Sequence, residues 1–183
     1  ITGEVDRLSR TVSQLLSFSR PSVVAGASAT LSEIVENVLA LTQSEADERA
    51  VKISSDLQAD PKLDGERAAA LKEVLLNLVL NALQAIKRDG EVKIETASNS
   101  DGGNGGNGGA NQLHIAVTDN GIGVPPSMQE KIFEPFFTTK QRGTGLGLAI
   151  VARRVRELGG TITLASPVVG GRGARFVITL PTV

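Results

Sequence analysis

The chain reads Asp119-Asn120-Gly121-Ile122-Gly123-Val124-Pro125 and, after a spacer, Gly143-Thr144-Gly145-Leu146-Gly147-Leu148-Ala149-Ile150. Upstream of both blocks, a run with helical spacing carries Glu73, Asn77 and Asn81. Together these segments predict a pocket that offers a carboxylate, several backbone amides without side-chain cover, and two side-chain amides. A purine nucleoside triphosphate with Mg²⁺ has the matching chemistry.

Composition restricts the classes of protein to which the chain can belong. The 183 residues, 40% of them hydrophobic, are enough for one compact domain with a short appendage. Cysteine is absent, which excludes disulfides, thiol nucleophiles and zinc–thiolate sites. The formal net charge of −1 gives no positive field to attract nucleic acid, so we expect no nucleic-acid partner.

Location is predicted from the absence of targeting signals. No run of about 18 to 20 consecutive apolar residues and no secretory leader is present, so we expect a soluble, cytoplasmic domain. Because the chain opens at Ile1 within a helical pattern, we expect it to be a piece of a longer protein. A membrane anchor elsewhere in that parent protein is left open.

The first segment, residues 3–19, has the periodicity of an amphipathic helix, which Arg20-Pro21 ends. Its apolar stripe consists of Val5, Leu8, Val12, Leu15, Leu16 and Phe18. Such a stripe needs a covering partner. One interpretation is half of a helical hairpin or a dimer interface, and the other is a helix that packs back on its own domain.

The rest of the chain mixes helical and strand periodicities. We expect helices over 31–47, with Ser28 or Thr30 as cap, over 66–86, and again after Gly147 as far as Gly159-Gly160. Strands are expected over 51–57, 91–97 and 112–118. The connector 99–111 is rich in Gly and Asn, joins two strands, and is interpreted as a loop without chemistry.

The helix over 66–86 carries polar groups on one face of an otherwise apolar surface. Glu73, Asn77, Asn81 and Gln84 are separated by four, four and three residues, so they stack along the helix. Buried carboxamides cost about 1 to 3 kcal/mol each unless they are hydrogen-bonded. They therefore bind a ligand, such as Mg²⁺ and phosphate, or tie the helix to a neighbouring loop. Glu73 is either a group that polarises an attacking atom or one that orients Asn77.

Asp119 stands where a predicted strand runs into a glycine turn. A carboxylate sheltered there by apolar neighbours can accept a hydrogen bond from an exocyclic amine such as that of adenine. Gly121 and Gly123 allow the backbone to approach a base or ribose closely. Taken alone, Asp-Asn-Gly is also a common turn sequence.

A loop rich in phenylalanine, 133–142, precedes the second glycine block and ends in polar and basic residues. It has the pattern of an anchored loop that closes over a ligand. The glycines that follow present bare amides and the positive end of a helix dipole to phosphate, and Lys140 or Arg142 could add charge.

The order and spacing of these blocks resemble the catalytic domain of the sensor histidine kinases of two-component signalling, within the GHKL superfamily of ATPases. Residues 73–81 look like the N box of that family, 119–124 like the G1 box, 133–140 like the F box and 143–147 like the G2 box. The resemblance is close over 60–183 and looser over the first helix, and the nitrogen-regulatory type of sensor looks nearest.

The resemblance implies an α+β fold: a two-layer α/β sandwich of the Bergerat type, with three helices on a mixed sheet. It implies a catalytic ATP-binding domain over 21–183, preceded at 1–20 by the second helix of a dimerisation hairpin. It also implies transfer of the γ-phosphoryl group of Mg²⁺-bound ATP to a histidine outside this segment. The implied partners are the histidine-bearing helix of the parent kinase, a response regulator receiver domain, and a second copy in a full-length homodimer.

The site residues carried over from the resemblance fall into two sets. Glu73 and Asn77 are the implied catalytic residues, and Asn77 with Asn81 would hold the metal. The implied nucleotide contacts are Asn77, Asn81, Asp119, Gly121, Ile122, Gly123, Lys140, Gly143, Thr144, Gly145, Leu146, Gly147 and Leu148.

The sequence departs from the family in two respects. Gln84 stands where many members have Lys, and Ala85 lies near the place of an aromatic residue, so we expect Lys140, Lys87 or Arg142 to supply the phosphate charge. The first hairpin helix with its acceptor histidine is missing, and His114 falls within a predicted strand. Two alternatives stay open: a nucleotide-sensing module without phosphoryl transfer, and a GHKL-type ATPase with Glu73 as the base that activates water.

Overall fold

The structure is a computed structural model that describes residues 27–99, 112–140, 143–168 and 171–181. The predicted helix over 3–19, most of the 99–111 connector, and Arg142 lie outside the described residues.

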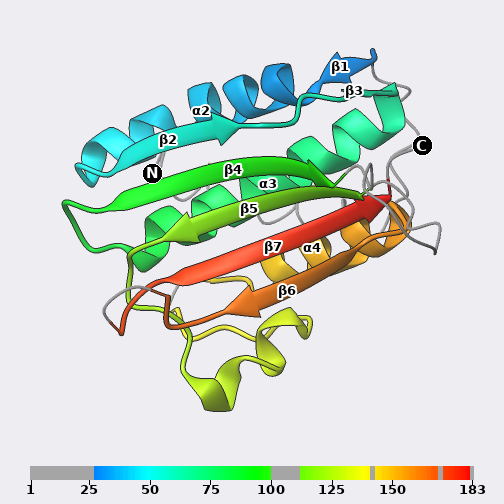
Figure 1. Ribbon diagram of the computed structural model, residues 1–183. Coiled ribbons are helices and arrows are strands. Elements are labelled where there is room, and N and C mark those ends of the chain that lie inside the picture. Colours follow the sequence, from blue (N-terminus) through cyan, green and yellow to red (C-terminus); the bar gives the residue numbers. More distant parts are fainter. Residues whose placement is uncertain (1–26, 100–111, 141–142, 169–170, 182–183) are drawn as a thin grey trace, which may run out of the picture.

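One layer of the domain is a five-stranded mixed sheet with the strand order β2-β4-β5-β7-β6 (Figure 1). Its strands are β2 (Lys52–Leu57), β4 (Glu91–Asn99), β5 (Gln112–Asp119), β7 (Ala174–Pro181) and β6 (Thr161–Ala165). β2 pairs with β4 in parallel, and the other neighbours are antiparallel. A separate two-stranded ribbon joins β1 (Ala29–Thr30) to β3 (Lys62–Leu63).

The second layer consists of three helices, which lie behind the sheet in Figure 1: α2 (Leu31–Glu48), α3 (Gly65–Ala85) and α4 (Gly147–Glu157). Local sequence explains where α2 and α3 begin. The Thr30 side chain accepts the N–H of Glu33 while the Glu33 carboxylate accepts that of Thr30, and Asp64 caps α3 by accepting from Arg67. Two short 3₁₀ turns, η1 (Pro126–Met128) and η2 (Lys131–Phe133), follow β5.

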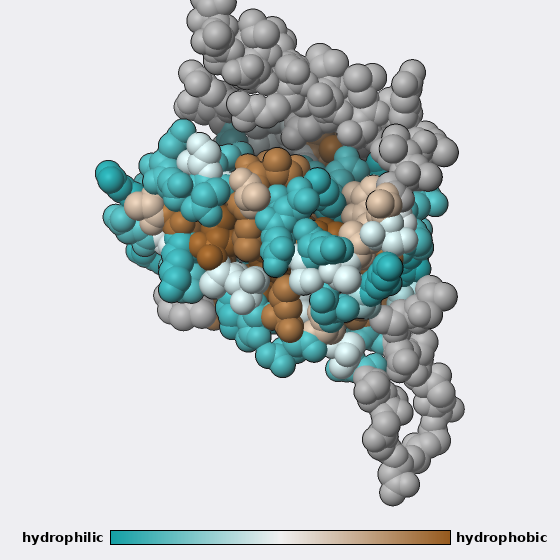
Figure 2. Space-filling model, turned by 90° about the horizontal axis from the view of Figure 1, so that it is seen from above, coloured by the Kyte–Doolittle hydropathy of each residue, from teal (hydrophilic) through white to brown (hydrophobic). Residues whose placement is uncertain are grey.

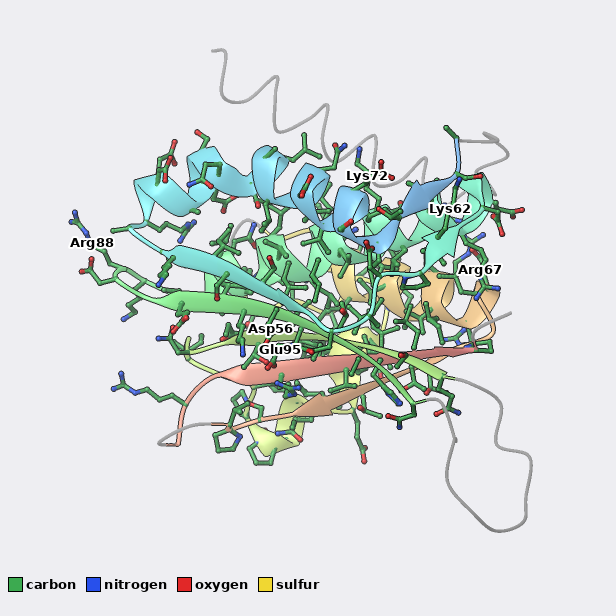
Figure 3. The ribbon with its side chains drawn as sticks, turned by 45° about the horizontal axis from the view of Figure 1, so that its top comes forward. Asp56, Lys62, Arg67, Lys72, Arg88 and Glu95 are labelled. Carbon is green, nitrogen blue, oxygen red and sulfur yellow. The ribbon has the colours of Figure 1, made fainter. Side chains whose placement is uncertain are left out.

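The core lies between the two layers because the strands alternate between apolar and polar residues. Ile115 and Val117 of β5 and Ile178 of β7 are buried on the helix side. The opposite side of the sheet is polar, with Glu95 bonded to both Lys93 and Arg175. Figure 3 shows Glu95 beside Asp56 on this uncovered side. The predicted two-layer α+β sandwich, with a mixed sheet and three helices, is confirmed.

Helix α3 is the centre of the molecule, since it contacts both other helices as well as β4 and β5. Within the part of the chain that the structure describes, it is also the one helix long and apolar enough, by length and composition, to cross a bilayer. Eight of its residues, including Leu75 and Leu78, are buried in the domain. Its apolar composition is therefore explained by its position in the core.

Candidate nucleotide-binding site

Asp119 is the last residue of β5, and its side chain is buried, with 6% of the residue exposed. One carboxylate oxygen, Oδ1, accepts the backbone N–H of Gly121 at 2.8 Å. Burial raises the pKa of Asp119 above its usual value, while the backbone hydrogen bonds from Gly121 and Ala174 and the charge of Lys140 oppose that rise. The result is an acceptor in a largely dehydrated setting, where a hydrogen bond from a ligand amine is strengthened.

The turn after β5 is fastened to the end of α3. The N–H of Ile122 donates to the carbonyl oxygen of Ala85 at 3.2 Å, and a Cβ on Gly121 would come within 2.7 Å of the same oxygen. Gly123 has a φ of +72°, and a side chain there would meet Ser166 Oγ at 2.8 Å. Both glycines are therefore required by the backbone, and the Ile122 side chain is left 72% exposed above the turn.

The polar face of α3 meets Lys140 from the loop that precedes the second glycine block. The Lys140 ammonium donates to Asn81 Oδ1 at 3.1 Å and to Gln84 Oε1 at 2.7 Å. Desolvation of this ammonium lowers the pKa of Lys140, partly offset by the charges of Glu45 and Asp119. Lys140 thus contacts Gln84, the residue at which the sequence departs from the family pattern.

Asn77 and Asn81 also lie against the start of α4. A Cβ on Gly147, the first residue of α4, would be 3.2 Å from Asn77 Oδ1 and 3.4 Å from Asn81 Nδ2. Asn77 Nδ2 donates to the backbone oxygen of Glu73 at 2.9 Å, which leaves its Oδ1 facing the helix terminus. A glycine at this point brings the backbone amides of α4 next to the side-chain oxygen of Asn77 and the side-chain nitrogen of Asn81.

The loop before α4 is held by a close backbone contact. Gly145 has a φ of +68°, and a Cβ there would overlap the carbonyl group of Phe136. The N–H of Phe136 donates to the oxygen of Gly145 at 2.9 Å, and Thr144 Oγ1 accepts the N–H of Leu146 at 3.4 Å. Gly143 to Leu146 therefore form a loop, and the helix itself begins at Gly147 with Leu148 partly buried in its first turn.

Glu73 makes a contact that sequence reasoning missed. Its Oε2 accepts a hydrogen bond from Nε of Arg154 at 2.7 Å, and Arg154 also donates to Glu157 at 2.8 Å. Arg154 is buried, with 6% exposed, and its pKa is raised: desolvation opposes the rise, and the bonds to Glu157 and Glu73 outweigh it. A charged residue within the apolar spacing of α4, between Val151 and Val155, was the available signal that a buried partner was needed.

Ser166 and Gly173 also shape the turn after β5, although neither belongs to a motif recognised in the sequence. Ser166 Oγ accepts the N–H of Val124 and donates to the oxygen of Gly173, both at 2.8 Å. Gly173 has a φ of +81°, and its N–H donates to Gly121 at 2.9 Å. The cluster of glycines before the last strand was the only hint in the sequence.

Among the residues that the structure describes, the predicted site residues form two neighbouring groups joined by α3. One group gathers around the C-terminal end of α3 and the turn after β5, with Asp119, Gly121, Ile122 and Gly123. The other gathers around the polar face of α3 and the start of α4: Glu73, Asn77, Asn81, Lys140, Gly143, Thr144, Gly145, Leu146, Gly147 and Leu148. His114 belongs to neither group, because it lies within β5 with Nδ1 3.1 Å from Thr179 Oγ1.

Comparison with known proteins shows the family to which the chain belongs. The family profile of histidine kinase-, DNA gyrase B- and HSP90-like ATPases matches residues 66–183. The histidine-protein kinase AtoS of Escherichia coli K12 is 39% identical over 99% of this chain and 28% of its own length. The sensor histidine kinase ZraS of Escherichia coli O157:H7 is 40% identical over 97% of this chain and 36% of its own length. This chain thus spans about a third of these relatives, which are named as protein-histidine kinases.

Solved structures give the same result at the level of the fold. The catalytic domain of histidine kinase ThkA has a TM-score of 0.69 at 27% identity, over 85% of this chain and 94% of that one. Full-length ShkA, solved in complex with AMPPNP, has a TM-score of 0.74 at 28% identity, over 96% of this chain and 36% of that one. The chain therefore belongs to the histidine kinase-, DNA gyrase B- and HSP90-like ATPase family, as a catalytic domain of the sensor histidine kinase type.

Proposed function

We propose that this chain binds ATP together with Mg²⁺ and, in its parent protein, donates the γ-phosphoryl group to a histidine outside this segment. One observation carries the proposal. Gly147 lies at the start of α4 against Asn77 and Asn81, and Lys140 reaches Asn81 and Gln84 from the adjoining loop. Cationic, amide and helix-terminal donors are thereby concentrated at one place, which suits a triphosphate.

The phosphate end of the proposed site consists of α3, Lys140 and the first turn of α4. Amides of the loop 143–148 and the Lys140 ammonium would neutralise and orient phosphate oxygens. Asn77 and Asn81 each carry a neutral side-chain oxygen, which fits a cation that is already coordinated by phosphates, and the oxygen of Asn81 would have to exchange its hydrogen bond with Lys140 for that cation. The described residues contain no cluster of three or more acidic or histidine side chains that could hold a metal alone. Mg²⁺, when bound with ATP, would neutralise phosphate charge between these residues.

The base end of the proposed site is the turn after β5. Asp119 would accept a hydrogen bond from the adenine exocyclic amine, and Gly121 and Gly123 would let the ring lie close to the backbone. Ile122, exposed above the turn, would cover the base. Guanine carries an oxygen where adenine carries that amine, so the carboxylate would disfavour GTP.

The proposed transfer takes place mainly by positioning and charge neutralisation. A nitrogen of the acceptor imidazole attacks the γ-phosphorus, a nitrogen–phosphorus bond forms, and the bond from that phosphorus to the β-phosphate oxygen breaks to release ADP. The attacking imidazole ring loses its N–H proton to water. Glu73 and Asn77 face this region from α3, and we propose that they orient the attacking group and the γ-phosphate. The phosphohistidine would then be the phosphoryl donor for a response regulator. The full-length protein would be a homodimer.

The test is a calorimetric titration of ATP with Mg²⁺ into the wild-type chain and into Asp119→Ala and Asn81→Ala. We expect the wild type to bind ATP and each variant to lose roughly tenfold or more in affinity, equivalent to about 1.4 kcal/mol. Ser98→Ala, on β4 away from the site, is the control. Absence of binding by the wild type at millimolar ATP would reject the nucleotide assignment.

The ATPase alternative depends on Glu73 acting on water. Against it stands the hydrogen bond between Glu73 Oε2 and Arg154, which ties this carboxylate to α4. Steady ATP hydrolysis by the chain, without an acceptor and abolished in Glu73→Gln, would favour the ATPase. Binding with neither hydrolysis nor transfer to a supplied acceptor helix would favour a nucleotide-sensing module.

A further inference from the structure

A groove of about 660 Å³ runs between the N-terminal halves of α2 and α3. Four lining positions on each helix have the same spacing, 33, 36, 37 and 40 on α2 and 65, 68, 69 and 72 on α3, and Ile34 of α2 also lines the groove. This is the spacing of a single helix face over about two turns. Two such helix faces side by side form a groove into which a third helix can pack.

The chemistry of the groove suits an apolar helix face. Its lining includes the small side chains Ala40, Ala68 and Ala69, which allow another helix to approach closely. Polar side chains line it as well, namely Glu33, Glu36 and Asn37 on α2 and Lys72 on α3, and a hydrogen bond of 3.1 Å from Lys72 to Asn37 links the two helices. Figure 3 shows Lys72 beside α2, and Figure 2, which looks onto the top of Figure 1, shows apolar surface between polar side chains on that side.

The groove also lies next to Ala27, the point at which the preceding residues join the described part of the chain. Ala27, the first described residue, and Ala29 are part of its lining. Seven residues, 20–26, separate Ala27 from the helix predicted over 3–19, and they can span at most about 25 Å. The groove is about two helical turns long, roughly 11 Å, so every part of it is within reach of that helix.

We infer that the apolar stripe of residues 3–19 docks in this groove of the same chain. The stripe supplies large apolar side chains that complement the alanines of the groove, among them Leu8, Val12 and Leu15. One stripe cannot cover the groove and a hairpin partner at the same time, so docking and hairpin formation compete. The inference goes beyond the proposed function, because the groove is about 150° around α3 from Asn77 and Asn81, at 100° per residue. A docked helix therefore leaves the nucleotide site open.

Cysteine pairs test the inference cleanly because the chain has no cysteine of its own. Leu15→Cys is combined in turn with Ala40→Cys and with Ala69→Cys, and oxidation is followed on non-reducing gels and by mass spectrometry. The control replaces Leu15→Cys by Gln14→Cys, on the far side of the predicted helix. We expect an intramolecular disulfide that forms at least tenfold faster in one Leu15 pair than in its control. Equal rates, or disulfides mainly between two chains, would overturn the inference.

Hydrogen exchange supplies a second test that needs no disulfide. In the wild type, amides within 3–19 should be protected. In Ala69→Glu, which places a charge in the groove, that protection should fall at least tenfold while α3 stays protected. Ala97→Glu, on the exposed part of β4, is the matched control and should leave 3–19 unchanged. Unprotected amides over 3–19 in the wild type would contradict docking, whatever the outcome of ATP titration.

Discussion

At the scale of single residues, the site depends on two titrating groups whose pKa values move in opposite directions. Burial raises the pKa of Asp119, and desolvation lowers the pKa of Lys140. Each shift brings the uncharged form of the group closer to neutral pH. Nucleotide binding, which needs both charges, should therefore weaken at both ends of the pH range.

On the acid side, ATP affinity should fall as the pH drops through the raised pKa of Asp119, because the protonated carboxyl loses an acceptor. Folding stability should respond in the opposite sense. A carboxyl with a raised pKa binds its proton more readily in the folded chain than in the unfolded chain, so protonation relieves an unfavourable buried charge. Titrations of ATP into Asp119→Asn show how much of the pH dependence comes from this carboxyl group. The ATP affinity of this variant should be roughly ten- to hundredfold lower near neutral pH, and it should no longer fall as the pH drops through the pKa of Asp119.

Gly147→Ala separates stability from binding. Alanine has the higher helix propensity and no positive φ is required at this position, so the melting temperature should hold or rise slightly. The added methyl would lie between Asn77 Oδ1 and Asn81 Nδ2, at 3.2 and 3.4 Å, where phosphate is proposed to bind. ATP affinity should fall about tenfold by calorimetry, and an unchanged affinity would show that phosphate is held elsewhere.

At the scale of elements, the sequence predicts helices α2, α3 and α4 and strands β2, β4 and β5 to within a few residues, whereas β1, β3, β6 and β7 were not predicted. Thr30 and Asp64 act as caps, and strong periodicity marks the helix that became α3. The partners of Glu73 and Gln84 could not be predicted in this way. Arg154 and Lys140 are 81 and 56 residues away along the chain, and only the packing of α3 against α4 and its preceding loop brings them near.

The ion pair between Glu73 and Arg154 predicts coupling between α3 and α4. Arg154→Met removes the cation and leaves Glu73 partly buried without its partner, which should lower stability by about 2 kcal/mol. The double variant Glu73→Leu with Arg154→Met should recover part of that loss, because no carboxylate is then left unpaired. Urea unfolding measures all three proteins, and additive losses in the double variant would mean that the two side chains act independently.

At the scale of the whole molecule, the nucleotide contacts come from α3, the turn after β5, and the loop leading to α4, so ATP should stabilise the entire domain. At a concentration one hundred times its dissociation constant, bound ATP adds about 2.7 kcal/mol. For a domain of this size, the melting temperature should rise by about 5 to 10 °C with Mg²⁺-ATP. Asp119→Ala should show little of this rise, and GTP should produce a smaller one in the wild type. An equal response to both nucleotides would argue against Asp119 as the adenine acceptor.

The hydrogen bond from Ile122 to Ala85 fixes the position of the turn after β5 on α3. It thereby also fixes the distance between the base end and the phosphate end of the proposed site. Asn77 and Ala85 lie on the same rigid helix, and their eight-residue separation corresponds to about 12 Å of helix axis. The distance between the base and phosphate ends is therefore set by a helical rise and cannot be adjusted by a loop. One residue inserted between positions 77 and 85 would rotate one end by about 100° relative to the other. A change in the number of residues between positions 77 and 85 would therefore misalign the two ends of the site, and no adjustment of the adjoining loops could restore the match.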